Sequence, residues 1–219
     1  MYRLAFVALA LSILSGCVTP IPLNEQAPSV EYVTKDKVLI AVVDERKRVK
    51  KGKPKDFVGL AHASFGIPVD WHVKQVLATE KEDKERNLSE FLAHRVVTGL
   101  NNKGWASQAI ALNSVPSAAE AKSLLSKDQA NKLFVLLLNE WYFSINLNWV
   151  SSFNFDTDSN VYVYQYEQGK TLEKNFAGRD VIEEEAGDSP QNKVLQAYRD
   201  QLAEILSDKE VQAALTESN

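Results

Sequence analysis

Cys17 is the single cysteine of the chain, and it closes the stretch LSILSGC after an apolar run and two small residues. A disulfide needs a second cysteine in the same chain, and a zinc or redox site needs another cysteine or a nearby histidine. The nearest histidine in the sequence is His62, so neither kind of site is indicated. Upstream, Arg3 precedes the apolar run Leu4–Leu14, which is too short to span a bilayer and is typical of a signal peptide. This context predicts a signal-peptide cleavage site next to Cys17.

The residues around this cleavage site resemble the lipobox of bacterial lipoproteins, and they are Leu14, Ser15, Gly16 and Cys17 itself. The resemblance implies that residues 1–16 are a signal peptide, that Cys17 carries a diacylglycerol, and that its new amino group is acylated. The alternative is an ordinary secretory signal with a chance cysteine at the cut. We favour the lipoprotein interpretation, because all features of the segment agree with it: the charged start, the short apolar core, the leucine at 14 and the small residues before the cysteine.

The expected lipid on Cys17 is sufficient to hold the protein on a membrane. Each buried methylene contributes about 0.8 kcal/mol and two lipid signals give stable anchoring, so a triacylated cysteine needs no amphipathic helix or basic patch. Val18 follows, where an aspartate would resemble the inner-membrane retention signal of enteric bacteria. The resemblance therefore favours the outer membrane, with the domain facing the periplasm. The membrane is an expected partner, and no cofactor is expected apart from the covalent lipid.

Other residues that could do chemistry give no clear site. The three histidines share no metal-ligand spacing, and they are His62, His72 and His94. The chain contains no G-x-S-x-G, H-E-x-x-H, P-loop or G-x-G-x-x-G motif. We therefore expect no catalytic residues, no metal and no enzymatic activity, with an unrecognised hydrolase as the alternative.

Two groups of carboxylates are candidate sites. Asp156 and Asp158 alternate as in a calcium loop, but the glycine and the closing glutamate of such a loop are missing, which favours a polar strand or turn. The three glutamates at 183–185 lie close to Asp188 and are typical of a solvated acidic loop. No second acidic cluster suggests a pair of catalytic carboxylates.

A basic stretch places seven cations within ten residues: Arg46, Lys47, Arg48, Lys50, Lys51, Lys53 and Lys55. We expect a solvated loop tip, because runs of like charge are most often solvated and protect against aggregation. The alternative is contact with an anionic envelope polymer, such as lipopolysaccharide or peptidoglycan, through Arg46, Arg48, Lys50, Lys51 and Lys53. Binding of that kind would weaken as salt screens the charges.

The chain after the anchor must fold into a domain that positions the basic stretch and the other candidate residues. Residues 17–35 contain three prolines and little periodicity, which predicts an extended tether, and residues 36–219 are expected to form a single periplasmic domain. An apolar, β-branched run predicts a central strand at 37–44, and Asn87 with Glu90 predicts a capping box at the start of a helix. Further strands are expected at 57–60, at 65–73 (an edge strand or loop) and at 105–112, and further helices at 117–129, 192–206 and 208–215.

The run from 132 to 149 is expected to be a strand. Its first half is continuously apolar, and from Trp141 the apolar residues alternate strictly, as in a strand with one buried face. Two more strands, at 151–166 and 171–182, flank a turn signal and complete an antiparallel meander. An aromatic stripe on this meander is a candidate interface for a protein partner, formed by Trp149, Tyr162, Tyr164 and Tyr166. The alternative is that these tyrosines cover a helix-packed or solvated face of the sheet.

The order of these elements predicts an α+β fold, with a mixed, mostly antiparallel sheet, the meander in the C-terminal half, and helices packed on one face. The chain resembles the YajG family of small envelope lipoproteins and, more distantly, accessory lipoproteins of envelope transport machines. The resemblance is carried by the lipobox, the strand ending in VDER (43–46), the helix LSEFLAHRVVTGLNNKGW (88–105) and the closing LSDKEVQAAL (206–215). It implies a fold and a location, and no reaction.

Charge and location narrow the function further. Removal of the signal takes Arg3 away and changes the formal net charge from −4 to −5, which argues against nucleic acid as a partner. The favoured function is an accessory or interaction subunit that docks on an envelope protein complex. The alternative is a glycan- or lipid-binding module that uses the loop 46–55 or an apolar cleft. The sequence does not indicate the oligomeric state.

Overall fold

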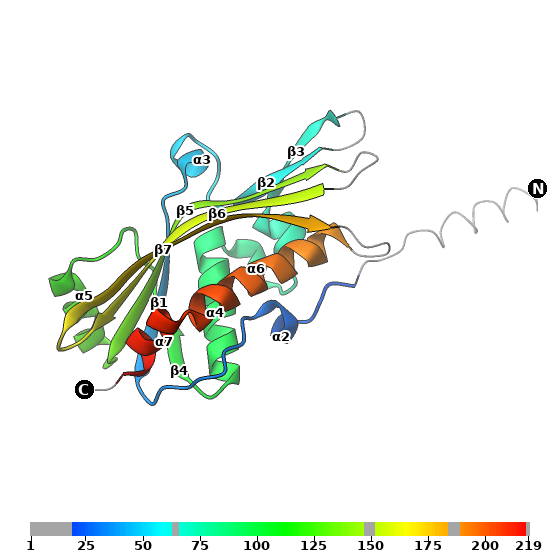
Figure 1. Ribbon diagram of the computed structural model, residues 1–219. Coiled ribbons are helices and arrows are strands. Elements are labelled where there is room, and N and C mark those ends of the chain that lie inside the picture. Colours follow the sequence, from blue (N-terminus) through cyan, green and yellow to red (C-terminus); the bar gives the residue numbers. More distant parts are fainter. Residues whose placement is uncertain (1–18, 63–65, 147–151, 184–188, 218–219) are drawn as a thin grey trace, which may run out of the picture.

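A computed structural model describes residues 19–62, 66–146, 152–183 and 189–217. Seven strands in these ranges form one sheet with the order β3-β2-β5-β1-β4, and β6 and β7 continue it beyond the other edge of β5 (Figure 1). The strands are β1 (Lys37–Asp44), β2 (Phe57–His62), β3 (Pro68–His72), β4 (Ala106–Ala109), β5 (Lys132–Asn146), β6 (Ser152–Gln165) and β7 (Gly169–Glu183). The helices are α2 (Leu23–Gln26), α3 (Lys47–Lys50), η2 (Val73–Leu77), η3 (Glu82–Glu85), α4 (Leu88–Asn102), α5 (Ala118–Lys127), α6 (Pro190–Ser207) and α7 (Lys209–Thr216).

β5 joins the two halves of the sheet. Its first half pairs in parallel with β1, and its second half pairs in parallel with β2 along the same edge. Along its other edge β5 pairs with the antiparallel β6, which in turn pairs with the antiparallel β7. The predicted meander and the α+β class are therefore confirmed.

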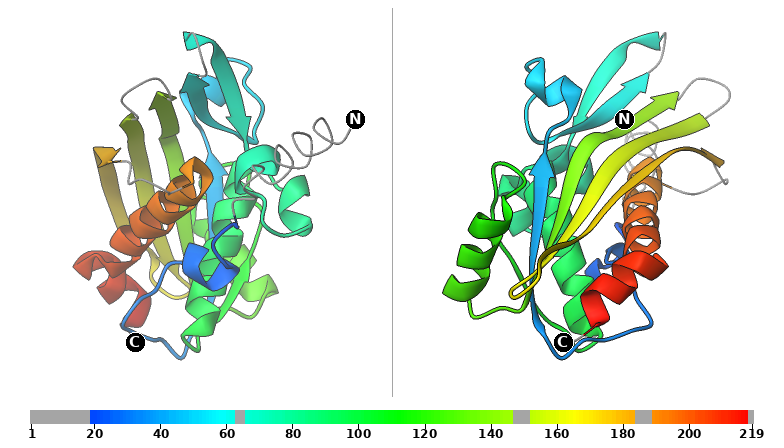
Figure 2. Two further views of the ribbon diagram at one scale, coloured as in Figure 1. Left: turned by 90° about the vertical axis from the view of Figure 1, so that its right-hand side faces the viewer. Right: turned by 60° about the vertical axis from the view of Figure 1, so that its left-hand side comes forward.

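Helices cover both faces of the sheet where β1 lies (Figure 2). One face of β1 packs into the core with α4, α6 and α7, through Val38, Ile40 and Val42. The other face packs against α5, through Leu39, Ala41 and Val43. The expectation that the helices share one face is thus corrected for α5. The reason is that β1 and the first half of β5 are apolar on both faces, so both faces need a cover.

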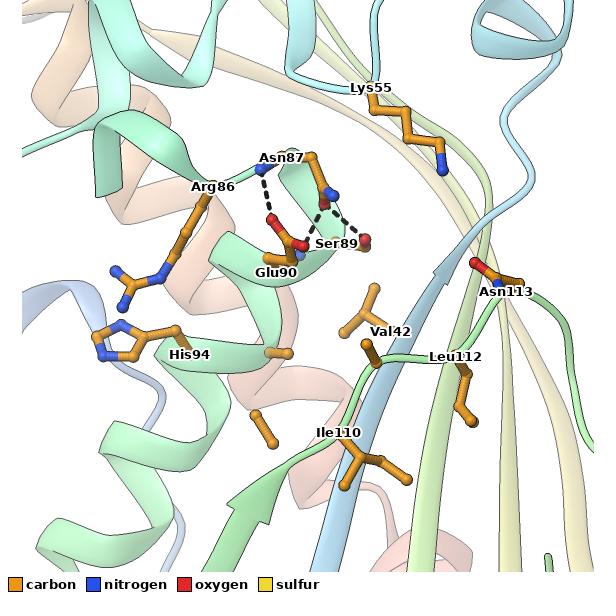
Figure 3. A pocket seen from close by; sticks show the side chains of 13 residues that line it. Val42, Lys55, Arg86, Asn87, Ser89, Glu90, His94, Ile110, Leu112 and Asn113 are labelled. Carbon is orange, nitrogen blue, oxygen red and sulfur yellow. Dashed lines mark hydrogen bonds between the residues drawn. The ribbon is translucent and has the colours of Figure 1, made fainter. Parts of the chain in front are cut away.

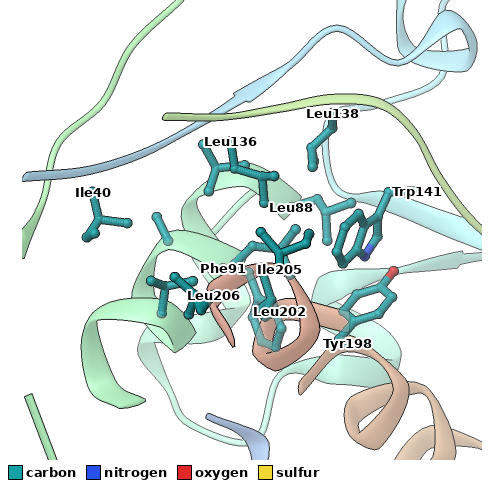
Figure 4. Packing of buried hydrophobic residues seen from close by; sticks show 14 of the residues in the cluster. Ile40, Leu88, Phe91, Leu136, Leu138, Trp141, Tyr198, Leu202, Ile205 and Leu206 are labelled. Atoms are coloured by element: carbon teal, nitrogen blue, oxygen red, sulfur yellow. The ribbon is translucent and has the colours of Figure 1, made fainter. Parts of the chain in front are cut away.

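The larger core lies between the sheet and the helices α4 and α6 (Figure 4). Trp141 of β5 meets Tyr198 of α6 edge-on, with ring centroids 5.6 Å apart, and Leu202 is buried beside them in the same cluster. Burying a large apolar side chain contributes about 1.5–3 kcal/mol, so this cluster carries much of the stability. The Trp141 indole nitrogen and the Tyr198 hydroxyl have no hydrogen-bond partner among the described residues, and burial raises the pKa of Tyr198.

α4 begins with the predicted capping box. The Asn87 side-chain oxygen accepts from the Glu90 backbone N–H at 3.0 Å, and a Glu90 carboxylate oxygen accepts from the Asn87 backbone N–H at 2.9 Å. Gly104, just past the end of the helix, has a φ of +89°, which favours glycine. Within the helix, a Cβ on Gly99 would lie 2.0 Å from the carbonyl oxygen of Pro28. Glycine at this position therefore lets the N-terminal segment approach α4 closely.

Residues 19–35, expected as an extended tether, lie along the domain instead. The short helix α2 contacts α6, and Ala27 and Val30 are buried. Tyr32 donates a hydrogen bond from its hydroxyl to the carbonyl oxygen of Leu206 at 2.6 Å. The prolines keep this segment mostly non-helical, as the sequence indicates, but its scattered apolar side chains gain enough by burial to hold it on α4 and α6.

Most element boundaries differ from the prediction by one to three residues, and two of these differences have a clear physical reason. The strand expected at 105–112 is shorter, because only Ala106–Ala109 pair with β1. α6 begins at Pro190 instead of Asn192, because Ser189 caps the helix and a proline fits its first turn.

Candidate functional site

The expected lipidation site lies outside the described residues. Cys17 and the other lipobox residues (Leu14, Ser15 and Gly16) precede Thr19, the first described residue. Trp149 of the candidate aromatic interface also lies outside the described residues. The structure does place Thr19, two positions after Cys17, and that placement bears directly on the anchor.

Asn192 of α6 holds the start of the described chain. Its side-chain amide donates to the carbonyl oxygen of Thr19 at 3.1 Å, and its side-chain oxygen accepts from the backbone N–H of Ile21 at 3.1 Å. One amide side chain thus supplies both a donor and an acceptor to the segment, as a neighbouring strand would. Sequence reasoning missed this role, because nothing in the sequence around Asn192 links it to residues 171 and 173 positions away.

A buried ionic cluster joins the N-terminal segment to α4. Arg95 places Nη2 2.6 Å and Nη1 3.2 Å from the two carboxylate oxygens of Asp83, and its Nε donates to the Gln26 side-chain oxygen at 3.0 Å. Gln26 in turn donates to the Ile21 carbonyl oxygen at 2.7 Å and to the Thr79 hydroxyl at 2.8 Å. Arg95, Asp83 and Gln26 are all fully buried. The cluster therefore connects α2, η3 and α4 through satisfied polar groups.

The charges in this cluster set the protonation of its members. Burial alone would raise the pKa of the Asp83 carboxyl, but hydrogen bonds and charge from Arg95, with a hydrogen bond from Arg86, hold that pKa below its ordinary value. Burial lowers the pKa of His94, and the charges of Arg86 and Arg95 lower it further. The His94 imidazole is therefore neutral at pH 7, and its Nδ1 accepts from Nη1 of Arg95 at 2.9 Å.

Three groups of this cluster have the chemistry of metal ligands. One ligand atom each from Glu80, Asp83 and His94 lie within 4.8 Å of one another. However, Arg95 and Arg86 already hold the Asp83 carboxylate, and two guanidinium charges at this distance repel a metal ion. The arrangement therefore fits a structural role, fixing the N-terminal segment to α4, better than metal binding.

Arg46 does not belong to the exposed basic surface, which corrects its place among the candidate polymer contacts. Its Nε and Nη2 each lie 2.8 Å from a carboxylate oxygen of Asp44, and both side chains are buried. Its Nη1 donates to the carbonyl oxygen of Phe57 at 2.7 Å. Arg46 thus ties the end of β1 to the start of β2, and its guanidinium is not free to contact a ligand.

The cations after Arg46 lie on α3 and the turn that follows it, and Lys51 is exposed there. Three of these cations have acidic partners: Arg48 pairs with Glu140, Lys50 with Glu45, and Lys53 with Asp70. Arg48 also lies over the ring of Tyr142, 3.7 Å from its centroid. Glu45, Asp70 and Glu140 thus pair with half of the six cations that follow Arg46, which favours the solvated loop over a polymer-binding patch.

Neutralising four of these cations is expected to have little effect. Changing Arg48, Lys50, Lys51 and Lys53 to glutamine should alter the free energy of unfolding by about 1 kcal/mol or less, because exposed ion pairs contribute little. Urea denaturation measures the stability, and sedimentation with peptidoglycan or lipopolysaccharide at several salt concentrations measures binding. We expect no salt-sensitive binding in the original protein. Salt-sensitive binding that the four changes abolish would contradict this prediction and support polymer contact.

The aromatic stripe lies under α5. Tyr164 is 2% exposed, and its hydroxyl donates to the carbonyl oxygen of Pro116 at 2.7 Å. Tyr162 and Tyr166 are half-buried in the same cluster. Tyr164 is therefore not available to a protein partner, and the alternative of a helix-packed sheet face describes it correctly.

A cleft of about 410 Å³ lies between the start of α4 and the chain that follows β4 (Figure 3). On one side it is lined by the apolar side chains of Val42, Ile110 and Leu112, and on the other by the capping box of Asn87 and Glu90. The two capping residues are hydrogen-bonded to each other. The lining is thus half apolar and half polar, which suits a small amphiphilic molecule better than a buried acyl chain.

No protein-family model matches the chain, and no curated protein matches it in sequence. None of the helices in the described ranges is long and apolar enough to cross a membrane.

Solved structures similar to this chain include protein XCC0632 of the family DUF330 from Xanthomonas campestris, with 10% identity over 86% of this chain and 94% of that one and a TM-score of 0.42. A PelC dodecamer from Paraburkholderia phytofirmans matches with 10% identity over 87% of this chain and 96% of that one, at a TM-score of 0.39. Lipoprotein GNA1162 from Neisseria meningitidis matches with 8% identity over 77% of this chain and 99% of that one, at a TM-score of 0.35. Similarity at this level assigns neither a family nor a function, and the resemblance to the YajG family stays a prediction.

Proposed function

We propose that the protein is a lipoprotein of the bacterial cell envelope, anchored by the lipid on Cys17 to the periplasmic face of the outer membrane. We further propose that it serves as an accessory subunit of an envelope protein complex. The lipobox at 14–17 supports the anchor. The bonds from Asn192 to Thr19 and Ile21 support it too, because they attach the domain directly behind the lipid-bearing residue.

The observation that carries the accessory role is the outer edge of β7. This strand is 15 residues long, and within the described part of the chain it pairs only with β6. Its residues 177–181 are all exposed. An unpaired strand edge presents a row of backbone donors and acceptors to which a strand of a partner can add. We therefore place the docking site for a protein partner on the outer edge of β7 around Ala177, before the tip of the strand at Val181.

The proposal assigns no reaction, metal or cofactor to the chain. The most deeply buried carboxylate, Asp83, is held ionised by two arginines. The neighbouring His94 accepts a hydrogen bond from Arg95, so its Nδ1 is not free to take a proton from a nucleophile. In the proposal, these groups hold the N-terminal segment against α4.

The cleft beside α4 supports a second candidate function, the binding of a glycan or lipid. Its volume of about 410 Å³ falls within the usual range of small-molecule sites, about 300–1,000 Å³. Leu112→Trp should fill the cleft from its apolar side. The variant would then lose binding of such a ligand, whereas docking of a partner on β7 would be unchanged.

Site-specific crosslinking in intact cells tests the accessory role. A photoreactive residue at Ala177, exposed on β7, should give an adduct of defined mass with another envelope protein. The same residue at Ser123, exposed on α5, is the matched control and should give none. Equal adducts at both positions, or none at Ala177, would contradict docking on β7.

Replacing Cys17 with serine should remove the protein from the membrane. The serine hydroxyl does not accept the diacylglycerol, so incorporation of labelled palmitate should fall to background and uncleaved or misprocessed precursor should accumulate. Metabolic labelling and immunoblots of fractionated cells measure both effects. Ser12→Ala, which lies in the apolar run and leaves the lipobox intact, serves as the control. Palmitate labelling of the Cys17→Ser protein at the original level would show that the lipid lies elsewhere.

A further inference from the structure

We propose that one defined end of the sheet contacts the membrane surface and thereby orients the domain. We call this the anchor end, and it consists of Thr19, Asn192 and the exposed side chains Ile67, Val69 and Val181. The inference rests on the lipidation of Cys17 proposed above. It adds the orientation of the domain and the side chains that meet the membrane.

The first support is the length of chain between the lipid and the domain. Thr19 follows Cys17 by two positions, and a fully extended chain spans at most about 3.6 Å per residue, so the two Cα atoms lie within roughly 7 Å of each other. Asn192 bonds Thr19 and Ile21 to the first turn of α6. A connection this short cannot hold the domain away from the bilayer, so the surface around Thr19 must face the lipid.

The second support is the set of strand ends that share this end of the molecule. In Figure 1 the start of the described chain, the first turn of α6, the ends of β2, β5 and β7 and the start of β6 lie at the right-hand side, opposite α5 and the C-terminus. The pairing registers confirm one row across five strands, formed by Val69, Ala61, Ile145, Phe153 and Ile182. With strands about 4.8 Å apart, this row is roughly 19 Å wide. The anchor end is therefore broad enough to set an orientation.

The third support is the location of the large apolar side chains that are exposed among the described residues. Four such side chains are exposed, and three of them lie at the anchor end: Ile67 at 59%, Val69 at 45% and Val181 at 62%. Single exposed apolar residues are ordinary, but these lie at both edges of the end of the sheet that follows from the lipid attachment point, where they can contact a bilayer. These side chains can enter the interface once the lipid brings the anchor end to it.

Charge does not drive this contact. In the described segments 66–70, 177–182 and 189–193, the cations are Arg179, which pairs with Asp156, and Lys193, and they are balanced in number by Asp70 and Asp180. Attraction to anionic lipid would need exposed lysines or arginines near the surface. The orientation should therefore depend little on salt or on the fraction of anionic lipid.

Fluorescence quenching in reconstituted vesicles tests the orientation. The lipid occupies the thiol of Cys17, so Ile67→Cys gives the full-length lipidated protein a single reactive thiol for a bimane label. Ser123→Cys on α5 provides the matched label at the opposite end. In vesicles of phosphatidylethanolamine and phosphatidylglycerol that contain spin-labelled lipid, we expect quenching at position 67 several-fold above that at position 123. Equal quenching at both positions would overturn the proposal.

Flotation of the same samples separates this inference from the proposed anchor. Protein that fails to float with the vesicles shows that the lipid anchor is wrong, whereas floating protein with equal quenching shows that only the orientation is wrong. A twelve-residue Gly/Ser insertion between Val18 and Thr19 adds a flexible span of roughly 20 Å. The insertion should leave flotation unchanged and bring quenching at position 67 down to the level at 123. Quenching that persists at position 67 would overturn the role given to the short connection.

Discussion

Asp83→Ala is expected to lower the free energy of unfolding by about 3–5 kcal/mol, because it leaves the buried guanidinium of Arg95 without its counter-ion. Arg86 loses the same partner, and the link from η3 to Gln26 is broken. Equilibrium urea denaturation of the mature protein measures the loss. Glu82→Ala, at the exposed neighbouring position, is the control and should change stability by about 0.5 kcal/mol or less.

The Asp83 carboxylate should also make the free energy of unfolding depend on pH. The pKa of Asp83 is lower in the folded protein than its ordinary value of 3.8, so the unfolded chain binds the proton more readily. Its contribution to stability is therefore complete above about pH 4 and is lost as the pH falls through the folded-state pKa. The difference between the original protein and Asp83→Ala should shrink correspondingly in acid. A variant as stable as Glu82→Ala at pH 7 would contradict both statements.

Arg46→Ala is expected to lower the free energy of unfolding by a similar amount, about 3–5 kcal/mol, because it leaves the buried carboxylate of Asp44 without its counter-ion. It also removes the donor to the carbonyl oxygen of Phe57, and that loss loosens β2 against β1. Arg48→Ala removes an exposed pair from the same basic stretch, so it is the matched control and should cost about 1 kcal/mol or less.

A double-mutant cycle distinguishes the ion pair from simple loss of packing. Asp44→Ala and Arg46→Ala together should cost clearly less than the sum of the two single changes, because the double variant contains no unpaired buried charge. Denaturation midpoints and slopes of the four proteins provide the coupling energy. Additive costs would show that Arg46 stabilises the fold by packing alone.

The fold class could be predicted because local patterns and tertiary environment agree. The continuous apolar run of β5 at 133–138 is covered on both faces, and the alternation from Trp141 onward follows the single buried face there. The capping box of Asn87 and Glu90 depends on residues three apart, so the sequence contains all the information it needs. Elements defined by near neighbours were therefore predicted correctly.

The polar contacts that place the anchor could not be predicted in the same way. Arg95 did give a signal, because it interrupts the apolar face of α4 and a buried cation needs a partner. Its partner Asp83, however, lies in the charged stretch 79–87, where nothing distinguishes it from the exposed acids beside it. Arg46 was misleading for a related reason: it begins a run of solvated cations, whereas its side chain turns back to Asp44 at the end of β1 and to the carbonyl oxygen of Phe57 in β2. Contacts of this kind depend on the register of the strands.

The central claim, a lipid on Cys17 directly in front of a docked segment, is tested most directly by mass spectrometry of the mature protein purified from membranes. Trypsin should release residues 17–35 as one peptide, because Lys35 is the first basic residue after Cys17. We predict that this peptide begins at Cys17 and carries a diacylglycerol together with an amide-linked acyl chain. A mature chain that begins at another residue, or a peptide with an unmodified Cys17, would contradict the account.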